Sequence, residues 1–206
     1  MKQGFDISYC QPEFDFDAAV QEGYEFCVIK MSQGRHDGTI YEDDYFQSHI
    51  NDAIAAGLSV GVYHFFGATN PDDARAEANA FISLYRSLVS PGATDDVGVW
   101  LDVEAEAGQV LDQVDKATLT ASVFEFILAC NQAGIDIGIY GNYDWLTNRI
   151  DMTQFADYVK IWLSEPDNEP YWKDEHPERT VKIWQNSFSG SVGGTCPVDT
   201  DVMYDE

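Results

Sequence analysis

The sequence is poor in basic residues, and this shortage is its most unusual property. Lys and Arg number 11 against 36 Asp and Glu, so the formal net charge of the 206-residue chain is −25. Nucleic-acid binding depends on Lys and Arg that neutralise phosphates, and attachment to anionic membrane surfaces also needs basic clusters. The composition therefore argues against both kinds of partner and favours a solvated acidic surface that keeps the protein soluble.

Long apolar runs are lacking as well. No stretch approaches the roughly 20 apolar residues that a membrane-spanning helix requires. The first residues, MKQGFD, lead straight into a strand pattern without an apolar leader, so we expect no signal peptide in this chain. Hydrophobic residues still make up 45% and aromatic residues 14% of the chain, which is enough for one compact domain over residues 1–206.

Cysteine and histidine are both scarce and show no metal-binding pattern. The four cysteines, Cys10, Cys27, Cys130 and Cys196, form no CxxC pair and have no zinc spacing with the four histidines. Cys27 and Cys130 lie in apolar segments that predict buried free thiols, whereas Cys10 and Cys196 lie in predicted loops and are either free or paired. We expect no metal and no cofactor. A nucleophilic triad is also not indicated, because there is no GxSxG motif.

Strand and helix patterns alternate over the first two-thirds of the chain. Apolar segments predict strands at residues 4–9, 26–32, 59–66, 97–104 and 136–140, and helical periodicity predicts helices at residues 16–22, 45–56, 71–88, 116–133 and 142–149. Three more strands are predicted at 159–163, 181–185 and 198–203, with a hairpin or loop at 187–194. This order predicts an α/β fold, a single TIM-like barrel with a helix-poor, hairpin-rich C-terminal third. An open doubly wound sheet is the alternative.

The strongest chemical signal is the pair of acids at the end of the strand predicted at 97–104. Side chains alternate along a strand, so Asp102 and Glu104 share one face, with Cβ atoms roughly 6.5–7 Å apart. Two acids at this separation repel, and partial burial raises the pKa of one of them. A carboxyl group that stays protonated near neutral pH can protonate a leaving oxygen, as cleavage of a glycosidic bond requires. The alternative is a solvated strand end or a helix cap.

Other strand ends supply further acids and aromatic residues, and in a parallel barrel these ends meet at one face. Asp6 lies between Phe5 and Ile7 in an apolar strand, where a carboxylate is costly unless it shares a polar pocket. Asp199 belongs to the last predicted strand. Candidates for stacking on sugar rings, or for hydrogen bonds to their hydroxyl and acetamido groups, are Tyr63, Tyr140, Trp162, Gln185 and Ser8. Core packing is the alternative for each aromatic residue.

The chain carries five characteristic segments in order: GFDISYCQ (4–11), FCVIKMSQG (26–34), DDYFQSHINDAIAAGLSVGVYHFF (43–66), VWLDVE (99–104), and IWQNSFSGSVGG followed by VDTDV (183–202). Together these resemble glycoside hydrolase family 25, the lysozymes often called Chalaropsis-type muramidases. The resemblance covers essentially the whole chain. It implies a flattened β/α barrel that cleaves the β-1,4 bond between N-acetylmuramic acid and N-acetylglucosamine in bacterial peptidoglycan, outside the cell or after release by lysis.

The resemblance also implies roles for individual residues. Glu104 would be the general acid and base, and Asp102 would orient the 2-acetamido group of the substrate or stabilise charge. Asp6 and Asp199 would line the same cleft, with Tyr63 and Tyr140 as substrate contacts. The reaction would retain configuration through participation of the acetamido group. The partner would be cell-wall peptidoglycan alone, bound by a monomer.

The sequence departs from the family pattern at two places. Asn186 stands where tyrosine is usual, and Thr200–Asp201 stands where leucine–asparagine is common, which affects the shape of the sugar subsites rather than the reaction. A chitinase-like or glucosaminidase barrel is one rival, although Gly98 and Trp100 occupy positions where chitinases carry aspartates. The other rival is a non-catalytic glycan-binding barrel, against which the retention of all four acids argues.

Overall fold

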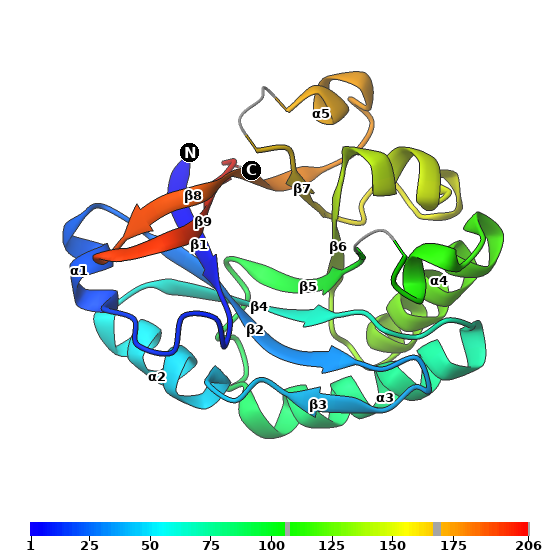
Figure 1. Cartoon of the computed structure of the whole chain (residues 1–206), viewed down its shortest axis with the longest axis horizontal. Helices are drawn as coiled ribbons and strands as arrows, with labels where there is room; N and C mark the ends of the chain where they lie inside the picture. The colour runs from blue at the N-terminus through cyan, green and yellow to red at the C-terminus, as the bar shows by residue number, and fades with distance from the viewer. Residues whose placement is uncertain (106–107, 167–169, 206) are drawn as a thin grey trace.

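The computed structural model describes residues 1–105, 108–166 and 170–205, and it shows a closed α/β barrel (Figure 1). Among these residues the ring has eight strands: β1 (Lys2–Ile7), β2 (Phe26–Gly34), β4 (Ser59–Phe65), β5 (Gly98–Asp102), β6 (Ile137–Asn142), β7 (Ile161–Ser164), β8 (Val181–Val192) and β9 (Thr195–Met203). The β1–β2 pairing closes the ring. The predicted barrel is thereby confirmed, and the open doubly wound alternative is wrong.

The strands run parallel around most of the ring and antiparallel only at the last one. The pairs from β1 to β2, and onward through β4, β5, β6 and β7 to β8, are parallel. Strand β9 returns antiparallel between β8 and β1. The carboxyl ends of seven described strands therefore meet at one end of the barrel, and β9 begins there.

Helices cover the outside of the ring (Figure 1). They are α1 (Phe16–Gln21), α2 (Phe46–Ala56), α3 (Pro71–Leu88), α4 (Lys116–Gln132) and α5 (Tyr171–Glu175), with the short turns η1 (Leu111–Gln113), η2 (Trp145–Arg149) and η3 (Met152–Gln154). Figure 1 shows α2, α3 and α4 along the flank of β2, β4 and β5, whereas only the five-residue α5 accompanies β7 and β8.

The long helices begin and end where local chemistry dictates. Asn70 precedes α3, and its Oδ1 accepts a hydrogen bond from the backbone N–H of Asp73 at 3.0 Å, with Pro71 in the first helical position. Asp115 caps α4 in the same way. Helix α2 ends at Gly57, whose φ of 93° is a left-handed conformation that glycine adopts without strain.

Two strands differ from the prediction. Strand β3 (Ile40–Glu42), antiparallel to β2 outside the ring, has no predicted counterpart, because three residues are too few for an alternation pattern. Strand β8 continues to Val192, beyond the predicted end at residue 185, and turns at Gly193 and Gly194 into β9. The glycine-rich segment is therefore a hairpin that extends past the barrel.

The apolar core has two parts, separated by the barrel wall. The outer core lies between strands and helices and includes Ile29, Leu101 and Phe126. The inner core fills the ring and consists of Phe26, Val28, Tyr63, Val97, Trp100, Tyr140, Trp162, Ile183 and Met203. Because side chains alternate along each strand, the residues two positions beyond the inner-core members also face the barrel interior.

The cysteines and helices add two observations. Cys27 and Cys130 are buried free thiols, as predicted, and Cys10 and Cys196 are exposed free thiols. Among the described residues, none of the helices combines the length and apolar character that crossing a bilayer requires.

Candidate active site

The interior of the barrel changes from apolar to acidic toward the carboxyl ends of the strands. Asp102 follows the inner-core residue Trp100 by two positions on β5, and Glu104 follows two positions later. On β9, Asp201 and Asp199 continue the inward face of Met203, and Asp6 of β1 pairs directly with Asp199. Five acidic residues from three strands thus converge above the inner core.

Gln185 connects three of the predicted site residues. Its Nε2 donates to Asp6 Oδ2 at 2.7 Å and to Asp199 Oδ2 at 3.4 Å, and its Oε1 accepts from the hydroxyl of Tyr140 at 2.8 Å. Gln185 is 2% exposed and therefore acts as a fixed bridge inside the barrel wall. The structure brings these four residues together, as the sequence predicts.

Burial and mutual repulsion raise the acid pKa values in this cluster. Burial raises the pKa of Asp6 well above its usual range, and the charges of Asp199 and Glu104 raise it further, although the amide of Gln185 lowers it. Burial also raises the pKa of Asp199 to about 6. The carboxyls of this cluster therefore release their protons at higher pH than exposed acids do.

Asp102 and Glu104 differ in depth. Asp102 is 5% exposed, and burial raises its pKa well above the usual range, with the Glu104 charge adding to the shift and Lys30 opposing it. Glu104 is half-buried, closer to the open end of the barrel. Each acid therefore has a different environment, which is the condition for dividing acid and electrostatic roles between neighbouring carboxyls.

Lys30 of β2 is a cation inside this acidic mouth that the sequence analysis did not single out. It is 7% exposed, and its Nζ donates to Gln33 Oε1 at 2.8 Å and lies 5.0 Å from the ring centroid of Phe65. Burial lowers the pKa of Lys30, while the charge of Asp102 raises it. The available signal was a lysine at an inward position of an almost fully apolar strand.

Asp201 is the second residue that was not predicted as part of the site. It is fully buried, and its Oδ1 accepts a hydrogen bond from Trp162 Nε1 at 2.8 Å. Its position two residues after Asp199 on one strand places both on the same face, so the alternation of β9 was a usable signal.

Trp162 corrects the expectation of a sugar-stacking ring. Its indole is 2% exposed and packs edge-on against Tyr140 and Tyr63, with centroids 4.6 and 6.0 Å apart. A ring enclosed in this way has no free face for a sugar, so Trp162 supports the site from below. Tyr63 and Tyr140 are also largely buried, and burial raises the pKa of both hydroxyls. Ser8 lies just beyond β1 in a turn, where its Oγ accepts from the N–H of Cys10.

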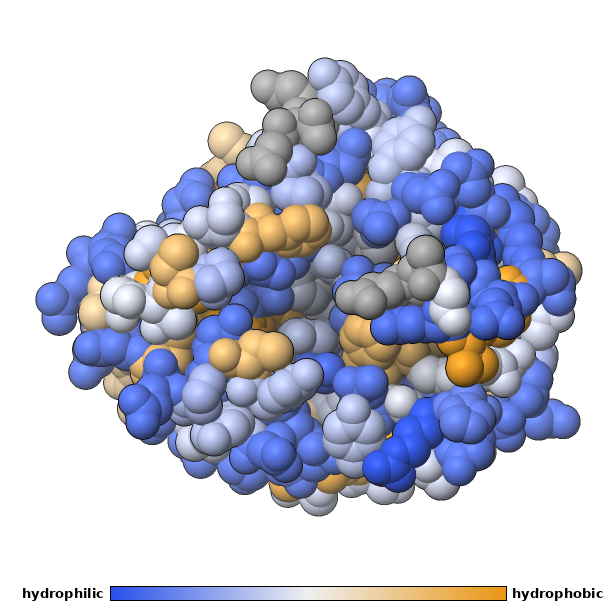
Figure 2. Space-filling model, in the orientation of Figure 1, coloured by the Kyte–Doolittle hydropathy of each residue, from blue (hydrophilic) through white to orange (hydrophobic). Residues whose placement is uncertain are grey.

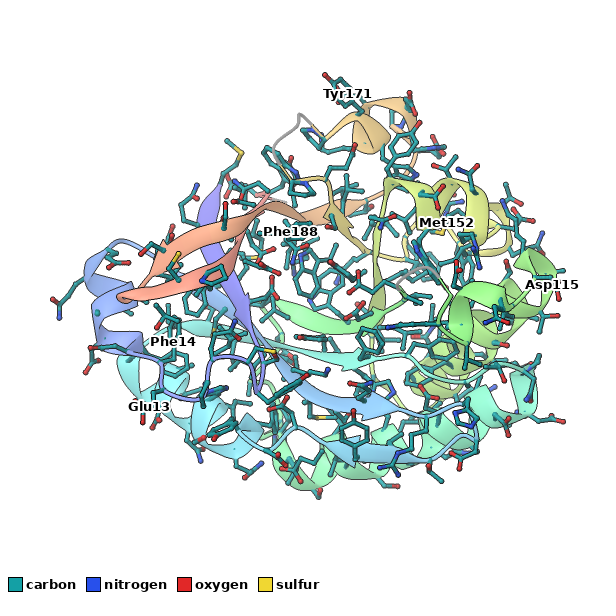
Figure 3. The ribbon with its side chains drawn as sticks, in the orientation of Figure 1. Glu13, Phe14, Asp115, Met152, Tyr171 and Phe188 are labelled. Atoms are coloured by element: carbon teal, nitrogen blue, oxygen red, sulfur yellow. The ribbon has the colours of Figure 1, made fainter. Side chains whose placement is uncertain are left out.

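A recess lies near the middle of the face shown in Figure 2, with apolar atoms along its border. Phe188 of β8, which is 51% exposed, lies near the middle of the same face (Figure 3). The sequence predicts only a hairpin or loop at residues 187–194, and Phe188 was not among the predicted site residues. The exposed ring of Phe188 lies on the hairpin whose other strand, β9, carries Asp199.

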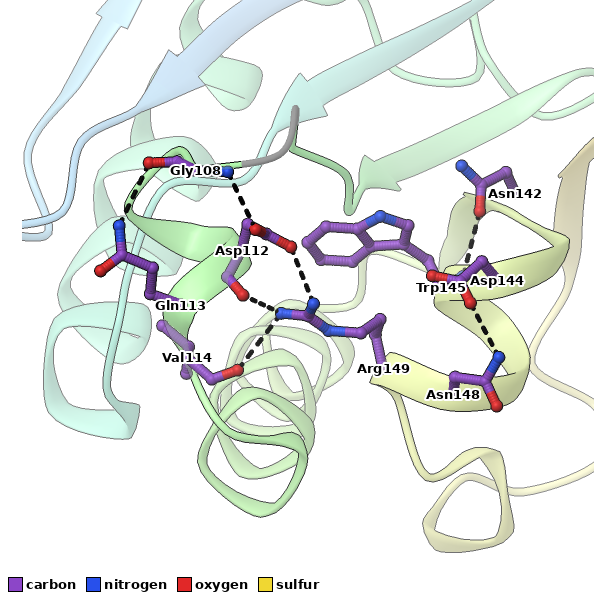
Figure 4. Close-up of polar contacts among 9 residues, drawn as sticks. All are labelled: Gly108, Asp112, Gln113, Val114, Asn142, Asp144, Trp145, Asn148 and Arg149. Carbon is purple, nitrogen blue, oxygen red and sulfur yellow. Dashed lines mark hydrogen bonds and ion pairs between the residues drawn. The ribbon is translucent and has the colours of Figure 1, made fainter.

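Residues 108–114 are anchored to the neighbouring η2 turn (Figure 4). Arg149 Nη1 donates to Asp112 Oδ1 at 2.8 Å, and Nη2 donates to the backbone carbonyl oxygens of Asp112 and Val114. The other carboxylate oxygen of Asp112 accepts from the N–H of Gly108 at 3.0 Å. This clamp ties residues 108–114 to η2.

A second buried polar group lies behind the barrel wall. His64 Nε2 and Glu77 Oε1 are 2.9 Å apart, the N–H of Gly67 donates to the same Glu77 oxygen, and Ser32 Oγ lies 2.8 Å from His64 Nδ1. Ser32, His64 and Glu77 are each 0% exposed, so this serine–histidine–glutamate arrangement cannot reach a substrate. Among the described residues there is also no cluster of three or more His, Cys, Asp or Glu that could hold a metal ion.

Comparison with known proteins connects this geometry to a family. Residues 5–195 match the family model described as "Glycosyl hydrolases family 25". The chain is 26% identical to the autolytic lysozyme of Clostridium acetobutylicum over 93% of its own length and 52% of the relative's, so it spans about half of that protein. It is 28% identical to an N,O-diacetylmuramidase of Arthroderma benhamiae, covering 93% of this chain and 79% of that one. A solved family 25 glycosyl hydrolase from Bacillus anthracis has the same fold, with a TM-score of 0.81, 20% identity, and coverage of 100% of this chain and 90% of that one.

Proposed function

Because the chain belongs to glycosyl hydrolases family 25, we propose that it is a peptidoglycan muramidase that hydrolyses the β-1,4 bond between N-acetylmuramic acid and N-acetylglucosamine. The observation that carries the proposal is the convergence of five acids above a closed apolar core, with burial and mutual charge raising the pKa of most of them. The relatives named lysozyme and N,O-diacetylmuramidase support the choice of bond.

Glu104 is the proton donor in this proposal. A general acid must reach the glycosidic oxygen, and Glu104 is the half-buried acid beyond the end of β5, whereas Asp102 lies deeper. The oxygen of the substrate's own acetamido group forms a bond to the anomeric carbon as the glycosidic bond breaks, and Glu104 gives its proton to the leaving oxygen. Glu104 then removes a proton from water, which displaces the acetamido oxygen and restores the β configuration.

The remaining acids orient the substrate and stabilise charge. Asp102, next to Glu104 and opposed by Lys30, is placed to hold the acetamido group during attack. Asp6 and Asp199 are held by Gln185 on the opposite wall and bind the sugar that carries the developing positive charge. Tyr63 and Tyr140 face these acids from β4 and β6.

The identity of the new reducing end tests the proposal directly. Purified Gram-positive peptidoglycan is digested, reduced with borohydride and analysed by mass spectrometry. Reduced muramic acid is the expected product. Reduced glucosamine would favour the glucosaminidase or chitinase-like alternative, and retained binding without new ends on several walls would favour a non-catalytic glycan-binding barrel.

The role of Glu104 is tested by Glu104→Gln with Glu25→Gln as its control. Removing a general acid typically lowers the rate by about 10²–10⁴-fold, so we expect Glu104→Gln to lose turnover on this scale and to keep binding glycan. Glu25 is exposed and precedes β2 at the opposite end of the barrel, so its substitution removes the same charge far from the acids. Wild-type turnover in Glu104→Gln would mean that another group is the acid.

A further inference from the structure

Asp201 is a fully buried carboxyl that the proposed chemistry does not use. Its Oδ1 accepts from Trp162 Nε1, and its Oδ2 has no hydrogen-bond donor among the described residues. Asp6 faces the same interior from the neighbouring strand, two positions along the β1–β9 register from Asp201, and the two carboxyls interact. Two carboxyls form a hydrogen bond with each other only when one of them carries a proton.

The hydrogen bonds favour Asp201 as the partner that carries this proton, because Asp6 Oδ2 already accepts from Gln185 whereas Asp201 Oδ2 accepts from no described donor. Burial raises the pKa of Asp201 well above its usual range, the charge of Asp6 raises it further, and the indole N–H of Trp162 lowers it. Asp6 accepts from Gln185 and also interacts with Asp201, so two groups surround the Asp6 carboxylate on this side.

Other titratable groups face the pair from each neighbouring strand. Asp199 lies on the same strand as Asp201, and the thiol of Cys27 on β2 feels the charge of Asp201. Glu104 acts on Asp6 across the mouth, and Tyr63 and Tyr140 face Asp6 from β4 and β6. Deprotonation of Asp201 would therefore place a second negative charge against Asp6 with further acids close by.

We propose that Asp201 is a positioning residue whose protonated carboxyl donates to Asp6 and holds the Asp6–Gln185–Tyr140 chain in its substrate-binding arrangement, so that loss of this proton limits turnover at alkaline pH. The inference rests on the proposed muramidase function. When the proton leaves, the Asp6 and Asp201 carboxylates repel, which pushes Asp6 away from the Gln185 amide that holds it. The hydroxyl of Tyr140, bound to the same amide, moves with it.

Asp201→Asn separates this role from a merely structural one. Asparagine has the shape of a protonated aspartate, so its NH₂ can donate to Asp6 at any pH while its oxygen accepts from Trp162. We expect the pH profile of kcat/KM for Asp201→Asn to have an alkaline midpoint at least one pH unit above that of the wild type. One pH unit above the wild-type midpoint, Asp201→Asn should be about five- to tenfold more active than the wild type. Asp205→Asn, an exposed change just past β9, should give the wild-type profile.

The direction of the shift discriminates the proposal from simple electrostatics. If Asp201 acted only through its charge on the general acid, removing that charge would lower the acid's pKa and move the alkaline midpoint down. An unchanged or lowered midpoint in Asp201→Asn therefore overturns the proposal. A wild type that releases no muramic acid ends would overturn the proposed function instead, and Asp201 is then judged by stability alone.

Thermal unfolding between pH 4 and 8 supplies that independent measurement. The folded state keeps a proton on Asp201 that the unfolded chain releases above its ordinary pKa of 3.8, so wild-type stability falls as pH rises through this window. We expect the Tm of Asp201→Asn to exceed that of the wild type by a margin that grows with pH, and a constant margin contradicts a protonated Asp201. If the variant does not fold, the infrared carbonyl band of a buried protonated carboxyl in the wild type at neutral pH decides, and its absence rejects the proposal.

Discussion

The buried carboxyls on the two sides of the barrel wall, Glu77 outside and Asp6 and Asp201 inside, are built in opposite ways. Behind the wall, Glu77 receives hydrogen bonds from its neighbours, His64 and the N–H of Gly67. Inside the barrel, Asp6, Asp199 and Asp201 face one another, and a single amide serves Asp6 and Asp199 together. Burial alone therefore does not distinguish a structural carboxylate from a chemical one.

The difference lies in what surrounds each carboxyl. Donors fixed by the backbone and by a packed histidine hold Glu77 in place, and a Cβ at position 34 would collide with its carboxyl, so Gly34 is required for this packing. Acids that face other acids have raised pKa values, because their negative charges repel. They therefore keep their protons to higher pH at the place where a substrate binds. The first arrangement stabilises the fold and the second costs stability in exchange for reactivity.

Glu77→Ala removes the structural carboxylate behind the barrel wall and has the largest expected effect on stability. Removing one partner from a buried, hydrogen-bonded pair costs about 3–5 kcal/mol, because the other partner is left unsatisfied. We expect urea unfolding to show a loss of this size, with kcat per folded molecule unchanged, because the group lies behind the wall.

Asp72→Ala is the matched control, since Asp72 is exposed on the same helix and its removal should change stability by about 0.5 kcal/mol at most. A drop in kcat for Glu77→Ala without a loss of stability would mean that the His64–Glu77 group transmits to the site.

Asp102→Asn, unlike Glu77→Ala, should raise stability and lower turnover. The pKa of Asp102 is raised in the folded state, so the stability associated with its protonated form is fully present below pH 3.8 and is lost as pH rises toward the folded pKa. Asparagine removes this loss, and the variant should gain up to about 1.4 kcal/mol over the wild type for each pH unit crossed in that window. Its turnover should fall by about tenfold or more, because stability and function conflict at such a site.

Urea unfolding at pH 4 and pH 7 measures this gain, and Asp136→Asn is the control because that side chain is 70% exposed. Equal stability of Asp102→Asn and the wild type at both pH values would show that burial of Asp102 carries no pH-dependent cost.

The alternation of strand residues explains how much of the site the sequence predicts. Asp102 and Glu104 share a face by parity alone, and Asp6 was identified because a carboxylate is costly in an apolar strand. The same parity joins Asp201 to Asp199, but the burial of Asp201 depends on β9 returning between β8 and β1, which the linear pattern does not reveal.

Exposure was the property that the sequence predicted least well. Trp162 matched the expected pattern of a strand-end aromatic residue, yet the ring closes over it from several strands. Phe188 lies in a segment with weak strand character, and only the hairpin geometry leaves its ring open. The barrel and the long helices follow from local periodicity and caps, whereas the depth of each side chain depends on how the strands close around it.

The many exposed carboxylates form a third class, and their expected effect, on the salt dependence of wall cleavage, is the smallest. The net charge of −25 should repel walls rich in anionic teichoic acid, and salt screens this repulsion because the Debye length falls from about 30 Å at 0.01 M to about 8 Å at 0.15 M. Initial cleavage rates on such walls should therefore rise severalfold over this range of NaCl. Walls stripped of teichoic acid are the control and should respond less, because little repulsion remains to be screened. A rate that only falls with salt on intact walls would mean that attraction near the site, through groups such as Lys30, outweighs the repulsion of the acidic surface.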